Sequence, residues 1–225
     1  AIYSDGGLLA FPLEDSVESL PLFGKTPTPH FSGYLDATAG CDTQVNGDEC
    51  KIHYWLALAD DDWQSKPLVL WLNGGPGGSS IVGFTEENGP LLINSTGGLM
   101  KNPYSWTRVA NFLILESPVG VGFSYCQAQV NGGICRNTDR FTATATRAAL
   151  EDFFRKFPEF SDSDFFITGE SYAGVYVPTL SYELLINPTD PPINLKGLAV
   201  GDPCTDNDSQ RESMDSLWYG HKYGL

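Results

Sequence analysis

The sequence predicts an α/β fold with a mostly parallel central sheet flanked by helices and with antiparallel strands near the N-terminus. Residues 66–72, 110–115 and 195–201 are near-continuous apolar runs, as in strands buried on both faces of a parallel sheet. Helical patterns lie between them, and a strand, a sharp turn and a helix succeed one another around Ser171. Buried strands that alternate with helices are typical of α/β folds with right-handed crossovers.

Length and composition restrict the function classes. A chain of 225 residues, 41% of them hydrophobic, suits one large domain or part of one. The net charge of −15 argues against nucleic acids and anionic membrane surfaces as partners, because both would be repelled. No run approaches the roughly 18 apolar residues of a membrane span. The chain opens on Ala1-Ile2-Tyr3-Ser4 without an initiator Met, so we expect a mature or excised piece.

The cysteines and two sequons favour a secreted protein, or a vacuolar or lysosomal one. Cys41 and Cys50 are nine residues apart, as are Cys126 and Cys135, so we expect two local disulfides. Zinc is the alternative, but neither spacing resembles the close pairs of metal sites, and we expect no metal ion and no cofactor. Cys204 is left over, which predicts a partner outside this sequence. The predicted glycosylation sites are Asn94 and Asn207.

The elements follow in order along the chain. Residues 1–28 are rich in Gly, Pro and acidic residues and predict an irregular lead-in. Residues 30–35 and 51–59 predict strands, and the apolar positions of residues 138–157 fall on one helical face that ends at Pro158. Further helices are predicted at residues 172–186, where Pro178 should kink the helix or mark its start, and at residues 209–225.

A glycine-rich loop, residues 73–80, directly follows the buried run 66–72. Four glycines within five residues allow backbone N–H groups to face open space, which is typical of an anion or oxyanion cradle. A phosphate loop is the competing interpretation, but the loop lacks the G-K-[ST] ending and has no basic residue nearby. Ser171, on its strand–turn–helix, is the candidate nucleophile. Both features follow strand ends, so they should face one cleft.

Four motifs together resemble the serine carboxypeptidase family of α/β-hydrolases: WLNGGPGGSS at 71–80, ENGP at 87–90, NPYSWTRVANFLILESPVGVGFSY at 102–125 and GESYAGVYVP at 169–178. The resemblance covers most of the chain from about residue 29. It implies that residues 1–225 are the N-terminal portion of a single α/β-hydrolase domain whose remainder is not in this chain.

The resemblance also implies roles for particular residues. Ser171 would attack the scissile carbonyl, and the backbone N–H groups of Gly75 and Tyr172 would form the oxyanion hole. The residues that would receive the C-terminal carboxylate of a peptide or protein substrate are Asn73, Gly74, Glu87 and Glu170. Two neighbouring carboxyl groups cannot both ionise cheaply, so one would keep a proton and donate it in a hydrogen bond to the substrate.

The sequence departs from the family pattern in three places. Gly78 stands where members usually have a cysteine, so that tether of the loop is absent. Asp202 and Cys204 replace residues more common after the last strand. Ala173 stands where the general nucleophile motif has glycine, but small residues suffice there and the family itself uses alanine.

The catalytic acid and histidine should follow the serine in chain order. His221 is the one downstream histidine, and it lies in an ordinary helical pattern, so we interpret it as structural, as we do His30 and His53 on strand patterns. The missing groups should come from a C-terminal remainder of the same enzyme or from a second processed chain, and a homodimer stays open. The alternatives to a carboxypeptidase are an acyltransferase or hydroxynitrile lyase of the same family, or a catalytically silent binding protein.

Overall fold

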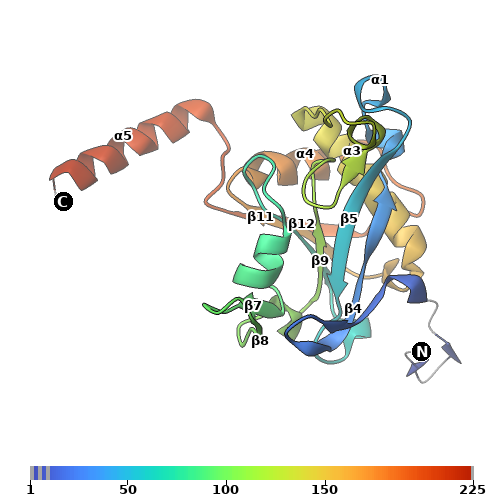
Figure 1. The fold of residues 1–225 in the computed structure, drawn as a ribbon. Helices are drawn as coiled ribbons and strands as arrows, with labels where there is room; N and C mark the ends of the chain where they lie inside the picture. The colour runs from blue at the N-terminus through green and yellow to red at the C-terminus, as the bar shows by residue number, and fades with distance from the viewer. Residues whose placement is uncertain (1–2, 5–6, 9–10, 224–225) are drawn as a thin grey trace.

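The computed structural model describes residues 3–4, 7–8 and 11–223 (Figure 1). Its strands are β1 (Tyr3–Ser4), β2 (Gly7–Leu8), β3 (Ser16–Leu20), β4 (Gly24–Asp36), β5 (Cys50–Ala57), β6 (Leu68–Leu72), β7 (Leu91–Ile93), β8 (Leu99–Lys101), β9 (Asn111–Leu115), β10 (Tyr125–Cys126), β11 (Phe165–Glu170) and β12 (Leu195–Gly201). Its helices are α1 (Thr43–Asn46), α2 (Gln127–Val130), α3 (Asp139–Lys156), α4 (Ala173–Ile186) and α5 (Asn207–Tyr223), with a π-helix, η4, at Gly83–Glu87 and short 3₁₀ turns between.

The main sheet confirms the predicted mixed α/β architecture. Within the described residues its order is β12-β11-β6-β9-β5-β4-β3, and β10 pairs with β5. The pairs from β12 to β9 are parallel, whereas β9, β5, β4 and β3 pair antiparallel. The sheet is therefore parallel at its centre and antiparallel toward the N-terminal strands, which lie side by side in Figure 1.

Strand β6 is buried on both faces, as its apolar run predicts. Alternate side chains of a strand point to opposite faces. Leu70 and its neighbours at 68 and 72 belong to the core that α3 and α4 cover, whereas Trp71 belongs to a second core with Phe84 of η4 and with Phe112. Helices α3 and α4 thus cover one face, and the η4 segment covers the other.

Helix α3 begins where the sequence predicts. The Thr138 hydroxyl accepts a hydrogen bond from the Phe141 N–H at 3.2 Å and caps the helix. Near the other end, the ring of Phe153 is fully buried, stacks on Phe157 at 4.7 Å and lies 6.0 Å from the ring of Tyr54 on β5. This aromatic cluster fixes α3 against the sheet.

The register of β11 on β6 positions the site. Thr168 pairs with Trp71 and Gly169 with Leu72, in parallel. Because the two strands run in the same direction and end at the same edge, the residues that follow them emerge side by side. The glycine loop after β6 and the turn after β11 therefore start as neighbours.

The predicted irregular lead-in over residues 1–28 is wrong in part. Ser16–Leu20 forms β3, and β4 already begins at Gly24. Pro27 and Pro29 hide the strand in the sequence, because proline cannot donate to a ladder. They are accommodated where the β3–β4 register shifts, between Val17 and Ser19. Residues 1–2, 5–6 and 9–10 of the predicted lead-in lie outside the described residues.

Two further expectations need correction. Helix α4 begins at Ala173, so Pro178 lies inside it and does not mark its start. Strand β12 forms as predicted but is not buried: its residues are half-buried or exposed, with Leu198 53% exposed. It is the outermost strand of the sheet in the described part of the chain, and α5 runs away from the body in Figure 1 instead of covering it.

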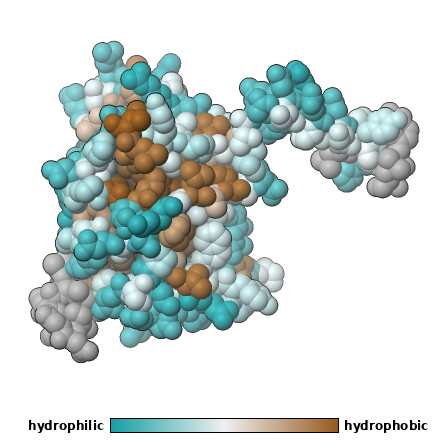
Figure 2. Space-filling model, turned by 180° about the vertical axis from the view of Figure 1, so that it is seen from behind, coloured by the Kyte–Doolittle hydropathy of each residue, from teal (hydrophilic) through white to brown (hydrophobic). Residues whose placement is uncertain are grey.

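The face that includes this edge carries exposed apolar side chains. Figure 2 shows hydrophobic residues gathered near the middle of the molecule as seen from behind. On α4, Leu185 is 71% exposed and Ile186 is 50% exposed, and Leu198 of β12 is exposed as well. Exposed apolar side chains gathered on one face are typical of an interaction surface.

Both predicted disulfides are present, Cys41–Cys50 and Cys126–Cys135. They lie close together, because Cys126 of β10 pairs in register with Cys50 of β5. The two cross-linked loops are further joined by Asn46, whose side chain donates to the Arg136 carbonyl at 2.9 Å and accepts from the Arg136 N–H at 2.7 Å. No group of three or more metal-ligating side chains occurs among the residues that the structure describes.

The aromatic cluster gives a stability prediction. Replacing Phe153 by Ala leaves a cavity under α3 and should lower the free energy of unfolding by about 3–5 kcal/mol, as is usual for buried phenylalanines. The measurement is urea denaturation, and the control is Tyr104→Ala, which removes an aromatic ring that is 82% exposed and should change the free energy by less than about 0.5 kcal/mol. Equal effects of the two substitutions would contradict this packing.

Candidate active site

Ser171 occupies the sharp turn between β11 and α4 in a left-handed conformation, with φ of +60°. Few residues other than glycine adopt this conformation, so the surrounding structure must hold it. The Ser171 N–H donates to the Gly201 carbonyl at 3.0 Å, and the Ser171 carbonyl accepts from the N–H groups of Cys204 and Gly174 at 2.9 Å each. The turn is thus fixed by the end of β12 and by the segment after it.

Small residues around Ser171 let these segments approach one another. A Cβ atom on Gly169 would lie 2.5 Å from the Cβ of Ala173, which is itself fully buried. One on Gly174 would lie 2.5 Å from the Cys204 carbonyl oxygen. Close backbone packing therefore requires the small residues of this motif. Ala173 is small enough for this packing, as the sequence predicts.

The glycine loop touches the Ser171 turn directly. A Cβ atom on Gly74 would collide with the backbone nitrogen of Tyr172 and would lie 2.9 Å from the Cβ of Ser171. Gly75 follows with φ of +118°, which only glycine adopts without strain. Within the described residues, nothing accepts a hydrogen bond from the N–H of Gly75 or of Tyr172. Two backbone donors therefore remain available beside Ser171.

Two hydroxyl groups anchor the loop. The Tyr176 hydroxyl, one turn along α4, accepts from the Gly77 N–H at 3.1 Å. The Ser80 hydroxyl accepts from the Asn73 N–H at 3.2 Å. Sequence reasoning missed both anchors. The signal for Tyr176 was its place on the helix that follows Ser171, and that for Ser80 was its place at the end of the loop.

Asn73 brings two carboxyl groups together. Its side-chain oxygen accepts from the Trp71 ring N–H at 2.9 Å and from the Gly83 N–H at 3.0 Å, which fixes the orientation of the amide. The Asn73 NH₂ group therefore faces the carboxylates of Glu87 and Glu170, each with an oxygen 3.3 Å away. One buried amide thus links η4 to the end of β11.

The environment favours a proton on Glu87. Partial desolvation raises the pKa of the Glu87 carboxyl above its ordinary value, although much of the residue is exposed, and the charge of Glu170 raises it further. The hydrogen bond from Asn73 opposes these effects in part. A carboxyl group that stays protonated at mildly acidic pH can donate a hydrogen bond to another carboxylate. The three side chains could therefore bind a carboxylate ligand.

The structure brings all seven predicted catalytic and carboxylate-binding residues to one edge of the sheet. They are Ser171, Gly75, Tyr172, Asn73, Gly74, Glu87 and Glu170. The predicted glycosylation positions lie elsewhere: Asn94 follows β7 and is half-buried, and Asn207 is exposed at the start of α5.

The histidines do not complete a triad in the described residues, where no hydrogen bond joins a histidine to Ser171. His30 is buried beside Trp55, and burial lowers its pKa to about 4, so its ring is neutral at physiological pH. His221 is exposed on α5. His53 contacts the buried Glu116, a partner that the strand pattern did not indicate.

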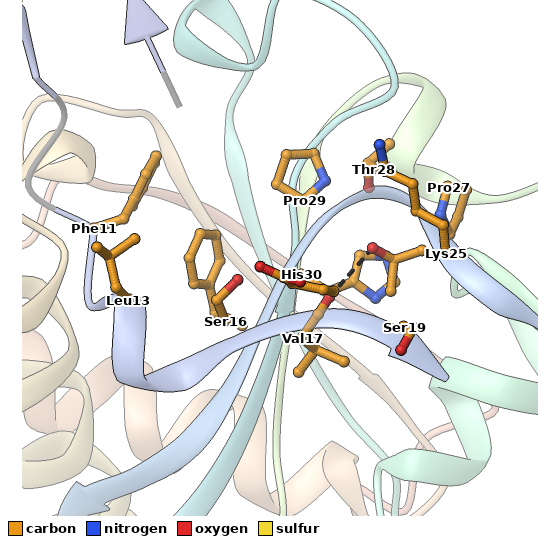
Figure 3. A pocket seen from close by; sticks show the side chains of 13 residues that line it. Phe11, Leu13, Ser16, Val17, Ser19, Lys25, Pro27, Thr28, Pro29 and His30 are labelled. Atoms are coloured by element: carbon orange, nitrogen blue, oxygen red, sulfur yellow. Dashed lines mark hydrogen bonds between the residues drawn. The ribbon is translucent and has the colours of Figure 1, made fainter. Parts of the chain in front are cut away.

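A hollow of about 890 Å³ lies between β3 and β4, away from these residues (Figure 3). Phe11 and residues 16–19 and 25–31 contribute to its lining, and none is a predicted site residue. His30 Nε2 and the Thr28 hydroxyl have no hydrogen-bond partner there, and a bound water would satisfy such groups. The candidate active site is thus defined by its hydrogen bonds and not by cavity volume.

Known proteins match nearly the whole chain. The mouse (Mus musculus) lysosomal protective protein is 40% identical over 218 residues, which are 96% of this chain and 42% of that protein. The serine carboxypeptidase ctsa-4.1 of Caenorhabditis elegans is 42% identical over 95% of this chain and 43% of its own length. The chain therefore spans less than half the length of these relatives.

A solved structure gives the same fold. The crystal structure of Kex1(delta)p, a prohormone-processing carboxypeptidase from Saccharomyces cerevisiae, superposes with a TM-score of 0.73 at 29% identity, over 88% of this chain and 43% of that one. The sequence profile described as serine carboxypeptidase matches residues 21–224. This chain therefore belongs to the serine carboxypeptidase family and has its α/β-hydrolase fold.

Proposed function

We propose that the protein is a serine carboxypeptidase that releases C-terminal amino acids from peptides through an acyl-enzyme on Ser171. The observation that carries this proposal is the Asn73 amide between Glu87 and Glu170, directly beside the Ser171 turn. A carboxylate site next to a nucleophile selects the last peptide bond of a chain. That selection distinguishes a carboxypeptidase from other enzymes with a serine nucleophile.

In the proposed reaction the Ser171 oxygen attacks the last peptide carbonyl and loses its proton to a base. The carbonyl oxygen becomes an oxyanion that the N–H groups of Gly75 and Tyr172 stabilise. The C–N bond then breaks, and the departing amino group takes up the proton. Water attacks the acyl-enzyme in the same way and releases the shortened peptide and Ser171.

The carboxylate pocket would give the reaction its pH range. A protonated carboxyl group shared by Glu87 and Glu170 donates a hydrogen bond to the substrate carboxylate. When the pH rises through the raised pKa of Glu87, the pocket loses this proton and gains a negative charge. The substrate is then repelled, so binding should weaken toward neutral pH.

The base and its acidic partner would come from a part of the enzyme outside this chain. The relatives are more than twice as long as the matched region, and α/β-hydrolases carry the acid and the histidine after the serine. We infer that this part, in one continuous chain or as a second processed chain, covers the open edge of β12 and the apolar residues near it. Cys204 lies beside this edge as a free thiol and is the candidate for a disulfide to that missing part.

We also propose that the protein travels through the secretory pathway, to the outside or to a lysosome or vacuole. Two disulfides fit an oxidising compartment, and one relative carries the name lysosomal protective protein. Glycosylation of Asn94 and Asn207 would fit the same route. Among the described residues, no helix has the length and apolarity to cross a membrane.

The direct test uses the complete enzyme, that is, this chain with the part that supplies acid and histidine. It should hydrolyse a blocked dipeptide and become labelled on Ser171 by a fluorophosphonate, and Ser171→Ala should lose both reactions. The same enzyme is also offered a glucose ester. Acyl transfer from this ester without dipeptide hydrolysis would identify an acyltransferase. Absence of labelling would identify a silent binding protein.

The pH dependence gives a second prediction. For the complete enzyme, KM for a blocked dipeptide should rise as the pH increases above the raised pKa of Glu87, while kcat changes less. Glu170→Gln should flatten this rise, because an amide donates to the substrate carboxylate at every pH. The control is Glu86→Gln, an exposed neighbour whose charge affects the pKa of Glu87 less than that of Glu170. The same KM profile in Glu170→Gln as in wild type would refute the shared-proton pocket.

A third prediction concerns the oxyanion loop. Gly74→Ala must push the loop off Tyr172, and kcat should fall by about 100-fold or more, the usual cost of losing an oxyanion donor. Gly220→Ala is the control: it adds the same methyl group on α5, away from the glycine loop, where an added Cβ has nothing within 4 Å, so kcat should stay within about twofold. If Gly74→Ala behaved like its control, the loop would not form the oxyanion hole.

A further inference from the structure

Glu116 is a fully buried carboxylate that the proposed reaction does not use. It directly follows β9, and among the described residues no Lys or Arg forms an ion pair with it. Its contacts are the Ser79 hydroxyl, which donates to Oε1, the Phe123 N–H, which donates to Oε2 at 2.7 Å, and His53 Nδ1, 3.0 Å from Oε2. A buried carboxylate is costly unless donors surround it, and the Ser79 hydroxyl and the Phe123 N–H are two such donors that stabilise the charge.

The surroundings are shaped around this carboxylate. Burial raises the pKa of Glu116, but the contacts with His53, Ser79 and the Phe123 N–H outweigh it, so the pKa lies below its ordinary value. Gly122 has φ of +55°, and a Cβ atom there would lie 2.5 Å from Oε2, so the turn after β9 wraps closely around the group. An ionised carboxylate in a tight enclosure is a rigid acceptor.

A chain of polar groups continues from Glu116 to two strands. The other ring nitrogen of His53, Nε2, lies 2.8 Å from the Ser32 hydroxyl on β4. The Ser124 hydroxyl donates to the Glu116 carbonyl at 2.6 Å and accepts from the His53 N–H at 2.8 Å. Glu116 is therefore held by β4, β5 and the turn after β9, which are parts of the rigid sheet.

The other end of this network is the glycine loop. Ser79 belongs to the loop, and its hydroxyl also accepts from the Ile81 N–H at 3.2 Å. The Gly78 N–H donates to the Gly74 carbonyl at 2.9 Å, which links this end of the loop to the residue in contact with Tyr172. A segment with four glycines has few side chains to fix it, so each anchor matters.

We propose that Glu116 is a positioning residue that, through the Ser79 hydroxyl, holds the glycine loop in the conformation that presents the Gly75 N–H to the oxyanion. The inference rests on the proposed function, because it assigns Glu116 a part in the same reaction. Glu116 touches no substrate. It acts by fixing a donor before the reaction begins, since a preorganised donor costs no rearrangement in the transition state.

The test measures kcat and KM of the complete enzyme for a blocked dipeptide in Ser79→Ala, Glu116→Gln and the double variant. Ser79→Ala should lower kcat by about 10-fold or more while KM stays within about twofold, because the donor acts on the transition state. The double variant should be no slower than the slower of the two single variants, since both residues act through one hydrogen bond. Fluorophosphonate labelling of Ser171 should slow in parallel with kcat.

The matched control is Ser117→Ala. Ser117 neighbours Glu116 and is also buried, but its hydroxyl bonds to the Thr146 hydroxyl at 2.8 Å and not to the glycine loop. This variant should keep kcat even where it lowers the melting temperature as much as Ser79→Ala does. Rescue of kcat is a further readout: Ser79→Thr, which keeps the hydroxyl donor, should retain more kcat than Ser79→Ala.

The outcomes separate this inference from the proposed function. A wild-type enzyme without peptidase activity or labelling would refute the proposed function itself. An active enzyme in which Ser79→Ala keeps its kcat would overturn the role of Glu116 alone. That role is overturned as well if Ser117→Ala reduces kcat equally or if the Ser79 and Glu116 effects multiply independently. If Glu116→Gln does not fold, the comparison of kcat between Ser79→Ala and Ser117→Ala decides.

Discussion

The parallel pairing of β11 with β6 is the constraint on which the rest of the site depends. The strands are in register up to Gly169 and Leu72, so two different turns begin at the same height of the sheet. One carries Ser171, and the other carries the glycine loop. Their backbones then approach so closely that Gly74 has no room for a side chain against Tyr172. A shift in this register would separate Ser171 from the Gly75 N–H and from the side chains of Asn73 and Glu87.

Buried polar groups add a second layer of order. The Asn73 amide is oriented by Trp71 and by the start of η4, and it then holds two carboxyl groups that would otherwise repel each other. On the other side of the loop, Glu116 accepts from Ser79 and from the turn after β9. The loop is thus held at its start by Asn73 and near its end by the hydrogen bond from Ser79 to Glu116. Its glycines give it the shape, and the neighbouring side chains give it the rigidity.

Sequence reasoning predicted the parts that local chemistry encodes. The apolar runs predicted β6 and β9, Thr138 and the helical face predicted α3, and the strand–turn–helix pattern predicted the turn at Ser171. It failed where contacts between distant parts of the chain decide strand bounds, burial and side-chain partners. The prolines of β4 obscured its first half, and β12 is apolar in sequence yet lies at an edge that nothing among the described residues covers. His53 looked ordinary because its partner, Glu116, lies far along the chain from it.

The central claim is that the pocket beside Ser171 recognises a free carboxyl terminus. The most direct measurement compares kcat/KM of the complete enzyme for one blocked dipeptide and for the same dipeptide with an amidated C-terminus at mildly acidic pH. A preference of at least about 100-fold for the free carboxylate, lost in Asn73→Ala, is the predicted result, because a carboxylate presents two charged acceptor oxygens to the site whereas the amide replaces one of them with a donor. Equal rates for the two substrates would contradict the assignment of Asn73, Glu87 and Glu170.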